Sequence, residues 1–317
     1  MTSLGDTAPL RDEAGLDAGD LGLYGLTVLA WGFSWYAIKL QVGSVPPEVS
    51  VFWRFVLAAA VTMGWAMLRG ARLRFAPKTH LRFAALGALI FSTNFTLFYY
   101  GGATVPSGLL SVVFSLTAVF NILLAFLIFG QRISRRVMGG AALGFIGVAL
   151  LFRPQIMGTG AAFDAQAFIG LGFCIAGTLS FCFGSMVSAS NQRIGIPVLS
   201  ASAWGMTYGA LLLGAFSLAR GHSFAVPMTL PYLGGLAYLA IVASVIAFAC
   251  YLTLIGRIGS ARAGYSTVMF PVVALLVSTV MEGFEWGPGA LAGLGCVLAG
   301  NLLVLRRTRS RPAPETG

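Results

Sequence analysis

The sequence has little charge, and its acidic residues avoid the long hydrophobic runs. Only 9% of its 317 residues are charged, whereas 57% are hydrophobic, so a soluble fold would be short of surface charge. The acidic residues lie in tails, in loops or in the last turn of a run: Asp6, Asp12, Glu13, Asp17, Asp20, Glu48, Asp164, Glu282, Glu285 and Glu315. This disfavours a carboxylate proton relay, a deep sodium site built from carboxylates and an acid–base pair for an enzyme inside a membrane.

Histidine and cysteine are also scarce. His80 and His222 fall in loops that we expect on opposite sides of a membrane, so no histidine cluster is available for a metal ion. The cysteines lie inside apolar runs without ligand spacing, and we expect small core residues and no disulfide; they are Cys174, Cys182, Cys250 and Cys296. These absences predict no metal, no cofactor and no enzymatic activity.

What the chain has instead is a series of hydrophobic runs of about twenty residues. A helix of that length crosses a hydrocarbon core roughly 30 Å thick, and the 41 Gly suit closely packed membrane helices. We expect spans near 21–41, 46–68, 82–102, 105–129, 136–152, 166–190, 198–219, 232–255, 261–281 and 288–305. The sequence therefore predicts an all-α polytopic membrane protein with about ten transmembrane helices, which lipid surrounds.

The basic residues predict how these helices are oriented. Sixteen of the 20 Lys and Arg residues fall in the tails and in alternate loops, on one side of the predicted topology: Arg11, Arg69, Arg72, Arg74, Lys78, Arg82, Arg132, Arg135, Arg136, Arg193, Arg257, Arg262, Arg306, Arg307, Arg309 and Arg311. Positively charged short loops stay in the cytoplasm, so we expect both termini to be cytoplasmic. The net charge of +10 then follows from topology and gives little support to nucleic-acid binding.

The chain also contains an internal repeat. Residues 111–125 (SVVFSLTAVFNILLA) align with residues 265–279 (YSTVMFPVVALLVST), and Gly140 and Gly147 then align with Gly293 and Gly300 after a one-residue gap. Because a five-span unit starts and ends on different sides of the membrane, its copy must be inverted, as in many alternating-access carriers. We predict a tail (1–20), a first half (21–152), an extracytoplasmic linker (153–165), a second half (166–306) and a basic tail (307–317).

Several segments together resemble a known family. The chain reads WGFSWYAIK at 31–39, PPEVSVFWRFVLAA at 46–59, YYGGATVPSGLLSVVFSLTAVF at 99–120, GQRIS at 130–134 and GGAALGFIGVALL at 139–151. This string is similar to the EamA-type carriers of the drug/metabolite transporter superfamily, and more loosely to their aromatic and neutral amino acid exporters. The resemblance implies a transporter. The chain departs from the family where Gln131 replaces a common Glu and Thr117 a common Pro.

Polar and aromatic groups inside the spans are the candidate substrate contacts. Hydroxyls recur at helical spacing, either as helix contacts or as the wall of a cavity, and Asn94 brings a buried amide with more donors and acceptors. The aromatic residues can line a cavity, face lipid or anchor at the interface, and together they favour an amphipathic guest. The candidates are Trp31, Ser34, Trp35, Lys39, Asn94, Phe98, Tyr99, Ser111, Ser115, Ser180, Tyr251 and Tyr265.

Three further residues are candidates for gating. Lys39 and Arg54 are the basic residues within spans, and both could extend toward lipid headgroups. Alternatively, Arg54 could pair with Glu282 and close an extracellular gate, or the pair could simply neutralise a buried charge. Pro271 interrupts the helical hydrogen bonds of the ninth span, which predicts either a hinge or a static kink.

These features predict an alternating-access transporter in a bacterial inner membrane. We expect export of small amphipathic metabolites such as aromatic and neutral amino acids, through a cavity between the repeats, by a monomer or a weak homodimer. A multidrug or quaternary-amine exporter of the same fold is the alternative, although the acidic group that would favour a cation is missing. A sugar-phosphate carrier should have several deep basic residues, and only Arg54 is a candidate.

Overall fold

The computed structural model describes residues 17–129, 134–157, 164–251, 253–254, 257 and 266–305. Every regular element in these ranges is a helix, and nine helical segments there are long and apolar enough to cross a membrane. A tenth apolar segment, 266–282, belongs to the predicted ninth span. The predicted all-α membrane fold is confirmed. Most of the two predicted tails and residues 130–133, 158–163 and 258–265 lie outside the described residues.

The first half of the chain contains α1 to α7, and its third and fourth spans are each built from more than one element. The elements are α1 (Ala18–Lys39), α2 (Pro47–Leu68), α3 (Pro77–Ala88), the π-helix η1 (Leu89–Asn94), α4 (Phe95–Gly102), α5 (Ser107–Ser115), α6 (Thr117–Phe129) and α7 (Arg135–Met157). The third span is α3, η1 and α4 in succession, and the fourth is α5 and α6, which are separated at Leu116. The first helix begins at Ala18, with Asp17 as its N-cap, three residues before the predicted start of the first half.

The second half follows the same plan. Its elements are α8 (Ala165–Arg193), α9 (Val198–Ala219), α10 (Leu230–Ala237), the π-helix η2 (Tyr238–Ile246), α12 (Ser266–Glu282) and α13 (Pro288–Leu305). The third span of this half again contains a π-helix, because η2 follows α10 as η1 follows α3. The irregular turns therefore recur at equivalent places in the two halves.

The second helices of the two halves also end in the same way. Gly70 follows α2 with a φ of 61°, and Gly221 follows α9 with a φ of 69°. In both cases the next amide bonds back to the carbonyl five residues earlier, from Ala71 to Ala66 and from His222 to Ser217. This is a Schellman cap, in which glycine adopts the left-handed conformation at little cost.

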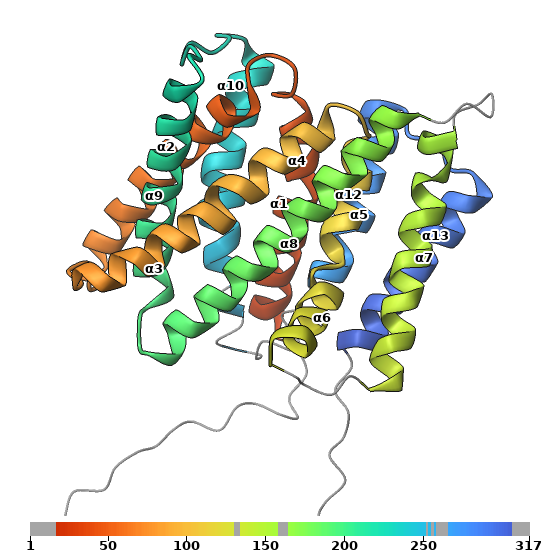
Figure 1. Cartoon of the computed structure of the whole chain (residues 1–317), viewed down its shortest axis with the longest axis horizontal. Coiled ribbons are helices and arrows are strands. Elements are labelled where there is room, and N and C mark those ends of the chain that lie inside the picture. The colour runs from red at the N-terminus through yellow and green to blue at the C-terminus, as the bar shows by residue number, and fades with distance from the viewer. Residues whose placement is uncertain are drawn as a thin grey trace, which may run out of the picture.

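The two ends of the bundle are named as follows. The helices α1 and α13 are antiparallel, so α1 begins at the same end of the bundle at which α13 ends. We call this the terminal end, at the bottom of Figure 1, and the opposite end the distal end.

The antiparallel pair of α7 and α13 brings the two halves together, and they lie side by side at the right of Figure 1. A Cβ atom built on Gly140 would meet the Gly300 carbonyl oxygen at 2.8 Å, and one on Gly147 would meet that of Gly293 at 2.5 Å. The repeat alignment equates Gly140 with Gly293 and Gly147 with Gly300. In the structure Gly140 instead meets Gly300, the counterpart of Gly147, and Gly147 meets Gly293, the counterpart of Gly140. That crossed pattern is expected for two copies related by a two-fold axis, which supports the inverted repeat.

The glycine contact gives a direct test of this packing. We expect Gly147→Ala to lower the free energy of unfolding by about 1–3 kcal/mol, because the added methyl group meets backbone atoms that cannot rotate away. Gly139→Ala is the matched control, since nothing lies within 4 Å of a Cβ at Gly139 on the same helix. Unfolding of the purified protein in mixed detergent micelles measures both. Equal stability of the two variants would contradict the close contact.

Candidate substrate site

Aromatic side chains from four helices meet in the middle of the bundle. The ring of Trp35 on α1 lies 5.1 Å from that of Phe98 on α4, 5.6 Å from that of Phe114 on α5 and 6.3 Å from that of Phe270 on α12. Trp31, one turn earlier on α1, lies 6.5 Å from Phe270. We call these five residues the central aromatic cluster. It is drawn from both halves of the chain, which is where an inverted-repeat carrier holds its substrate.

Unsatisfied polar groups accompany this cluster. The indole nitrogen of Trp35 and both side-chain polar atoms of Asn94 are buried without a hydrogen-bond partner, as is Nη1 of Arg54. Asn94 is the last residue of η1 and is 1% exposed. Buried polar atoms are normally paired, so an unpaired set at the centre of a membrane protein indicates a site that a polar ligand or water completes.

The two π-helices are tied to the opposite half of the chain. Trp31 Nε1 donates to the carbonyl oxygen of Ala243 in η2 at 3.2 Å, and Ser180 Oγ on α8 donates to that of Leu89 in η1 at 2.7 Å. Thus the first helix of each half bonds to the irregular turn in the third span of the other half. A π-turn interrupts the regular hydrogen-bond ladder, and in lipid the polar groups that this frees need partners. We call these two bonds the crossed hydrogen bonds.

A network of polar contacts closes the distal end. Tyr99 donates to Gln41 Oε1 at 2.5 Å, Gln41 Nε2 donates to the Tyr232 carbonyl oxygen at 3.4 Å, and the Tyr232 and Ser50 hydroxyls are 2.9 Å apart. These bonds link the turn that follows α1 to α2, α4 and α10, and Gln41 is fully buried.

Two carboxylates add to this closure. Glu48 is fully buried, accepts a bond from Tyr100 at 3.0 Å and lies 3.6 Å from Arg220 and 3.7 Å from His222. Glu282, at the end of α12, accepts bonds from the Ser107 amide at 3.1 Å, from the Ser107 hydroxyl and from Ser278 at 2.8 Å. It therefore caps the N-terminus of α5, where a negative charge is favourable.

The predicted pairing of Arg54 with Glu282 is corrected by these contacts. Among the described residues, Glu282 bonds to Ser107 and Ser278, whereas Arg54 donates from Nε to Ser244 at 3.1 Å. The guanidinium carbon also lies 4.0 Å from the centre of the Phe95 ring. Arg54 is thus directed toward η2 and α4 and not toward the end of α12.

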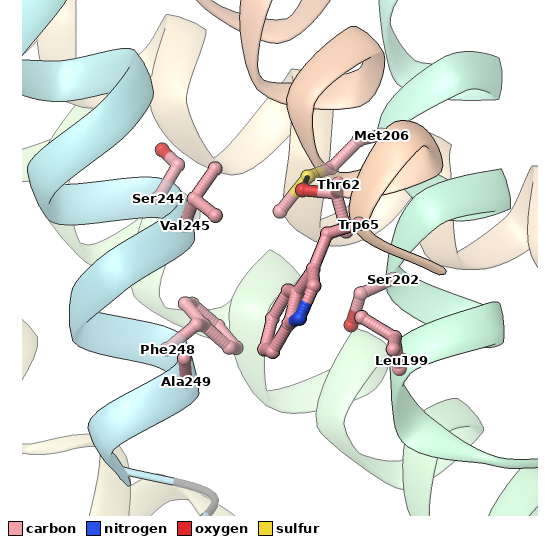
Figure 2. Close-up of a pocket in the computed structure, with 9 residues that line it drawn as sticks. All are labelled: Thr62, Trp65, Leu199, Ser202, Met206, Ser244, Val245, Phe248 and Ala249. Atoms are coloured by element: carbon pink, nitrogen blue, oxygen red, sulfur yellow. Dashed lines mark hydrogen bonds between the residues drawn. The ribbon is translucent and has the colours of Figure 1, made fainter. Parts of the chain in front are cut away.

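The terminal half of the bundle contains a narrow pocket between α2, α9 and the third span of the second half (Figure 2). Its lining is mostly apolar with three hydroxyls: Thr62, Trp65, Leu199, Ser202, Met206, Ser244, Val245, Phe248 and Ala249. In Figure 2 the Trp65 ring projects into the space between η2 and α9, facing Phe248. The pocket reaches Ser244, which is the hydroxyl that Arg54 contacts, so it leads from the terminal half toward the buried guanidinium.

The remaining predicted site residues separate into two groups. Trp31, Trp35 and Phe98 join the central aromatic cluster, Tyr251 lies 5.1 Å from Trp31, and Tyr99 belongs to the distal network. The serine hydroxyls instead bond to backbone carbonyls: Ser34 to Trp31, Ser111 to Gly108, Ser115 to Val112 and Ser180 to Leu89. Ser115 also accepts from Asn301 at 3.2 Å. These bonds favour helix contacts over a cavity wall for the serines.

The structure also describes two of the last three predicted residues, Lys39 and Pro271. Lys39 donates to the Gly102 carbonyl oxygen at 2.8 Å and so joins α1 to α4 at the distal end. Pro271 is buried inside α12, with Phe270 next to it in the aromatic cluster. Tyr265 lies outside the described residues. Three residues of these networks were not predicted from the sequence: Gln41, Tyr232 and Ser244. Gln41 and Ser244 are polar residues within apolar surroundings, which could have indicated them, whereas no such signal marks Tyr232.

Comparison with known proteins agrees with this architecture. The profile of the EamA-like transporter family matches residues 21–153 and 168–306, one segment in each half. The chain belongs to the EamA-like transporter family. Proteins of this family that the chain resembles are named as transporters or efflux pumps, so a carrier and not an enzyme is the established class.

Three curated relatives and one solved structure show how far the similarity extends. An uncharacterized inner membrane transporter of Escherichia coli, YedA, is 28% identical over 89% of each chain. A probable terminal-alkyne amino-acid exporter of Streptantibioticus cattleyicolor is 27% identical over 90% of this chain and 93% of its own. A probable amino-acid metabolite efflux pump of E. coli is 25% identical over 81% and 84%. A crystal structure with 18% identity superposes with a TM-score of 0.63 over 90% of this chain and 96% of its own, which shows the shared fold.

The crossed hydrogen bonds can be tested by deleting one hydroxyl. We expect Ser180→Ala to lower the free energy of unfolding by about 0.5–1.5 kcal/mol, because the Leu89 carbonyl loses its partner in an apolar environment. Ser185→Ala is the control, since that hydroxyl bonds only to Phe181 on its own helix. Detergent unfolding of both purified variants measures the difference. A Ser180→Ala variant as stable as the control would show that the bond does not hold the halves together.

Proposed function

We propose that this EamA-family carrier exports small amphipathic metabolites, with amino acids that have aromatic or neutral side chains among its substrates. The observation that carries the proposal is the central aromatic cluster with its unpaired polar atoms, contributed by both halves of an inverted repeat. A large apolar side chain suits the aromatic rings, and a polar headgroup suits the unpaired donors. The names of the relatives from S. cattleyicolor and E. coli, which mention amino acids and their metabolites, support the same class.

The arrangement of the two ends supports export by alternating access. The distal network closes one end, whereas the pocket lies in the terminal half. If the termini are cytoplasmic, as the distribution of basic residues predicts, this conformation loads substrate from the cytoplasm. If the two halves then exchange their conformations, the distal end opens and the substrate is released outside. We place the protein in the bacterial inner membrane, as the name of YedA suggests for that relative.

Counterflow in proteoliposomes tests the proposal. We expect saturable exchange of labelled phenylalanine and no movement of methyl viologen, because the described spans hold no acidic residue at mid-depth that could pair with a dication. Exchange of methyl viologen alone would favour the multidrug alternative. Absence of exchange for both compounds would overturn the proposed substrate class.

A variant of the aromatic cluster locates the site. We expect Trp35→Ala to raise the concentration of phenylalanine needed for half-maximal counterflow by about tenfold or more, since a buried ring contact is lost. Phe33→Ala on the same helix is the control, because Phe33 is 47% exposed and points away from the core. Identical values for Trp35→Ala and the unchanged protein would place the substrate elsewhere.

A further inference from the structure

We propose that Arg54 binds the carboxylate of the substrate, and that the site accepts amphipathic monocarboxylates whether or not they carry an ammonium group. The inference rests on the proposed function and makes it more specific. It names the group that the protein recognises and the group that it does not. Amino acids would then be one subset of a wider class that includes N-acylated amino acids and simple aromatic carboxylates.

The first observation is that Arg54 is buried with an incomplete set of partners. It is 3% exposed, and Nε donates to Ser244 while Nη1 has no partner. The aromatic rings of Phe95 and Phe55 lie 4.0 Å and 5.4 Å from the guanidinium carbon. Such rings stabilise a cation in part, but they do not satisfy its N–H donors. The guanidinium therefore has a free donor inside the bundle.

The second observation is that no carboxylate of the described residues neutralises this charge. The acidic side chains at the ends of the spans already have other partners. Glu48 is close to Arg220, Glu282 bonds to Ser107, and Asp20 lies 3.4 Å from Arg257. A buried charge without a counter-ion destabilises the fold, so an arginine retained in this state indicates a functional role. An anionic ligand is the group that removes this cost.

The position of Arg54 connects it to both parts of the candidate site. Its partner Ser244 also lines the pocket of the terminal half, so the guanidinium lies directly behind one wall of that pocket. Phe95, which the guanidinium covers, follows Asn94 in the chain, and Phe98 of the central aromatic cluster lies one turn further along α4. A molecule with a carboxylate on Arg54 and an apolar body among these rings fits the chemistry of the site.

The same site has nothing charged to offer an ammonium group. The unpaired groups on the helices around the cluster include the donors Arg54 Nη1, Trp35 Nε1 and Asn94 Nδ2, and the acceptors among them, Asn94 Oδ1 and the Thr96 hydroxyl, are neutral. A neutral amide oxygen can accept a bond from an ammonium, an amide or a hydroxyl, and it gives no large preference for a positive charge. The carboxylate is therefore the charged group on which recognition depends.

A series of phenylalanine relatives separates these roles. The unchanged full-length protein in detergent is titrated with 3-phenylpropanoate, N-acetylphenylalanine, phenylalanine methyl ester and phenethylamine, and the shift in melting temperature gives each affinity. We expect the two carboxylates to bind within about tenfold of phenylalanine, and the ester and the amine to bind at least about tenfold more weakly, because a charge-assisted hydrogen bond is lost. The same compounds should compete in the same order in phenylalanine counterflow.

Variants of the arginine assign the effect. We expect Arg54→Gln to weaken carboxylate binding by about 10- to 100-fold and to leave binding of the ester unchanged, while Arg54→Lys recovers part of the loss. Arg82→Gln is the matched control for loss of a positive charge, because Arg82 is exposed at the terminal end and bonds to Ser190. The ligand series on the unchanged protein decides the question even if an Arg54 variant fails to fold.

The outcomes separate this inference from the proposed function. Carboxylate binding that depends on Arg54, without any counterflow, would support the inference and overturn export of these compounds. Phenylalanine counterflow that the ester or the amine inhibits as well as 3-phenylpropanoate does would support export and overturn the inference. Failure of every carboxylate to bind or to be transported would overturn both.

Discussion

The structure depends on one constraint, which is that backbone polar groups inside a membrane must find partners within the protein. Regular helices satisfy them internally, but the third and fourth spans of this chain do not stay regular. At the π-helices η1 and η2, side chains from other helices bond to backbone carbonyls, with Ser180 donating to Leu89 and Trp31 to Ala243. Because each partner comes from the other half of the repeat, the irregular turns also join the two halves.

The crossed hydrogen bonds explain how an irregular core can remain able to move. A packed glycine interface such as that of α7 and α13 is rigid, since backbone approaches backbone directly. A side-chain hydrogen bond to a π-turn can break and re-form without unfolding either helix, at a modest free-energy cost. The symmetry of the two bonds suits a carrier whose halves exchange conformations, and the distal network of Gln41, Tyr99 and Tyr232 then belongs to one of the two states.

Much of this fold could be predicted from the sequence, because the signals are local. Hydrophobic length predicted the spans, and the aligned glycines Gly140, Gly147, Gly293 and Gly300 predicted a repeat. That these glycines meet one another between α7 and α13 was visible only in the structure. The π-helices and the interruption at Leu116 were not predicted, since their sequences read as ordinary apolar helix. Helical periodicity reports which face is apolar, and it does not report an extra residue in one turn.

The candidate site could be predicted only in part, for a related reason. Trp31 and Trp35 are four residues apart, so the sequence places them on one helix face, and the structure brings both into the central aromatic cluster with Phe98. The partners of Arg54 and Glu282 were not predicted, because each residue bonds to a group that is distant in the sequence. Arg54 bonds to Ser244, 190 residues away, and Glu282 bonds to Ser107, 175 residues away. Such contacts are decided by the tertiary arrangement and not by local pattern.

We infer that the distal end is closed in this conformation and opens during transport. Val105 lies in the distal loop before α5 and is 1% exposed, so a cysteine placed there reports on closure. The direct measurement is the rate at which a membrane-impermeant maleimide labels Val105→Cys in intact cells, with Ser44→Cys in the exposed loop after α1 as the reference. A distal end that opens during transport predicts slow labelling at rest and labelling at least about tenfold faster while an exported carboxylate is supplied from the cytoplasm, with a constant rate at the reference. Labelling at position 105 that matches the reference at rest, or that does not change during export, would contradict it.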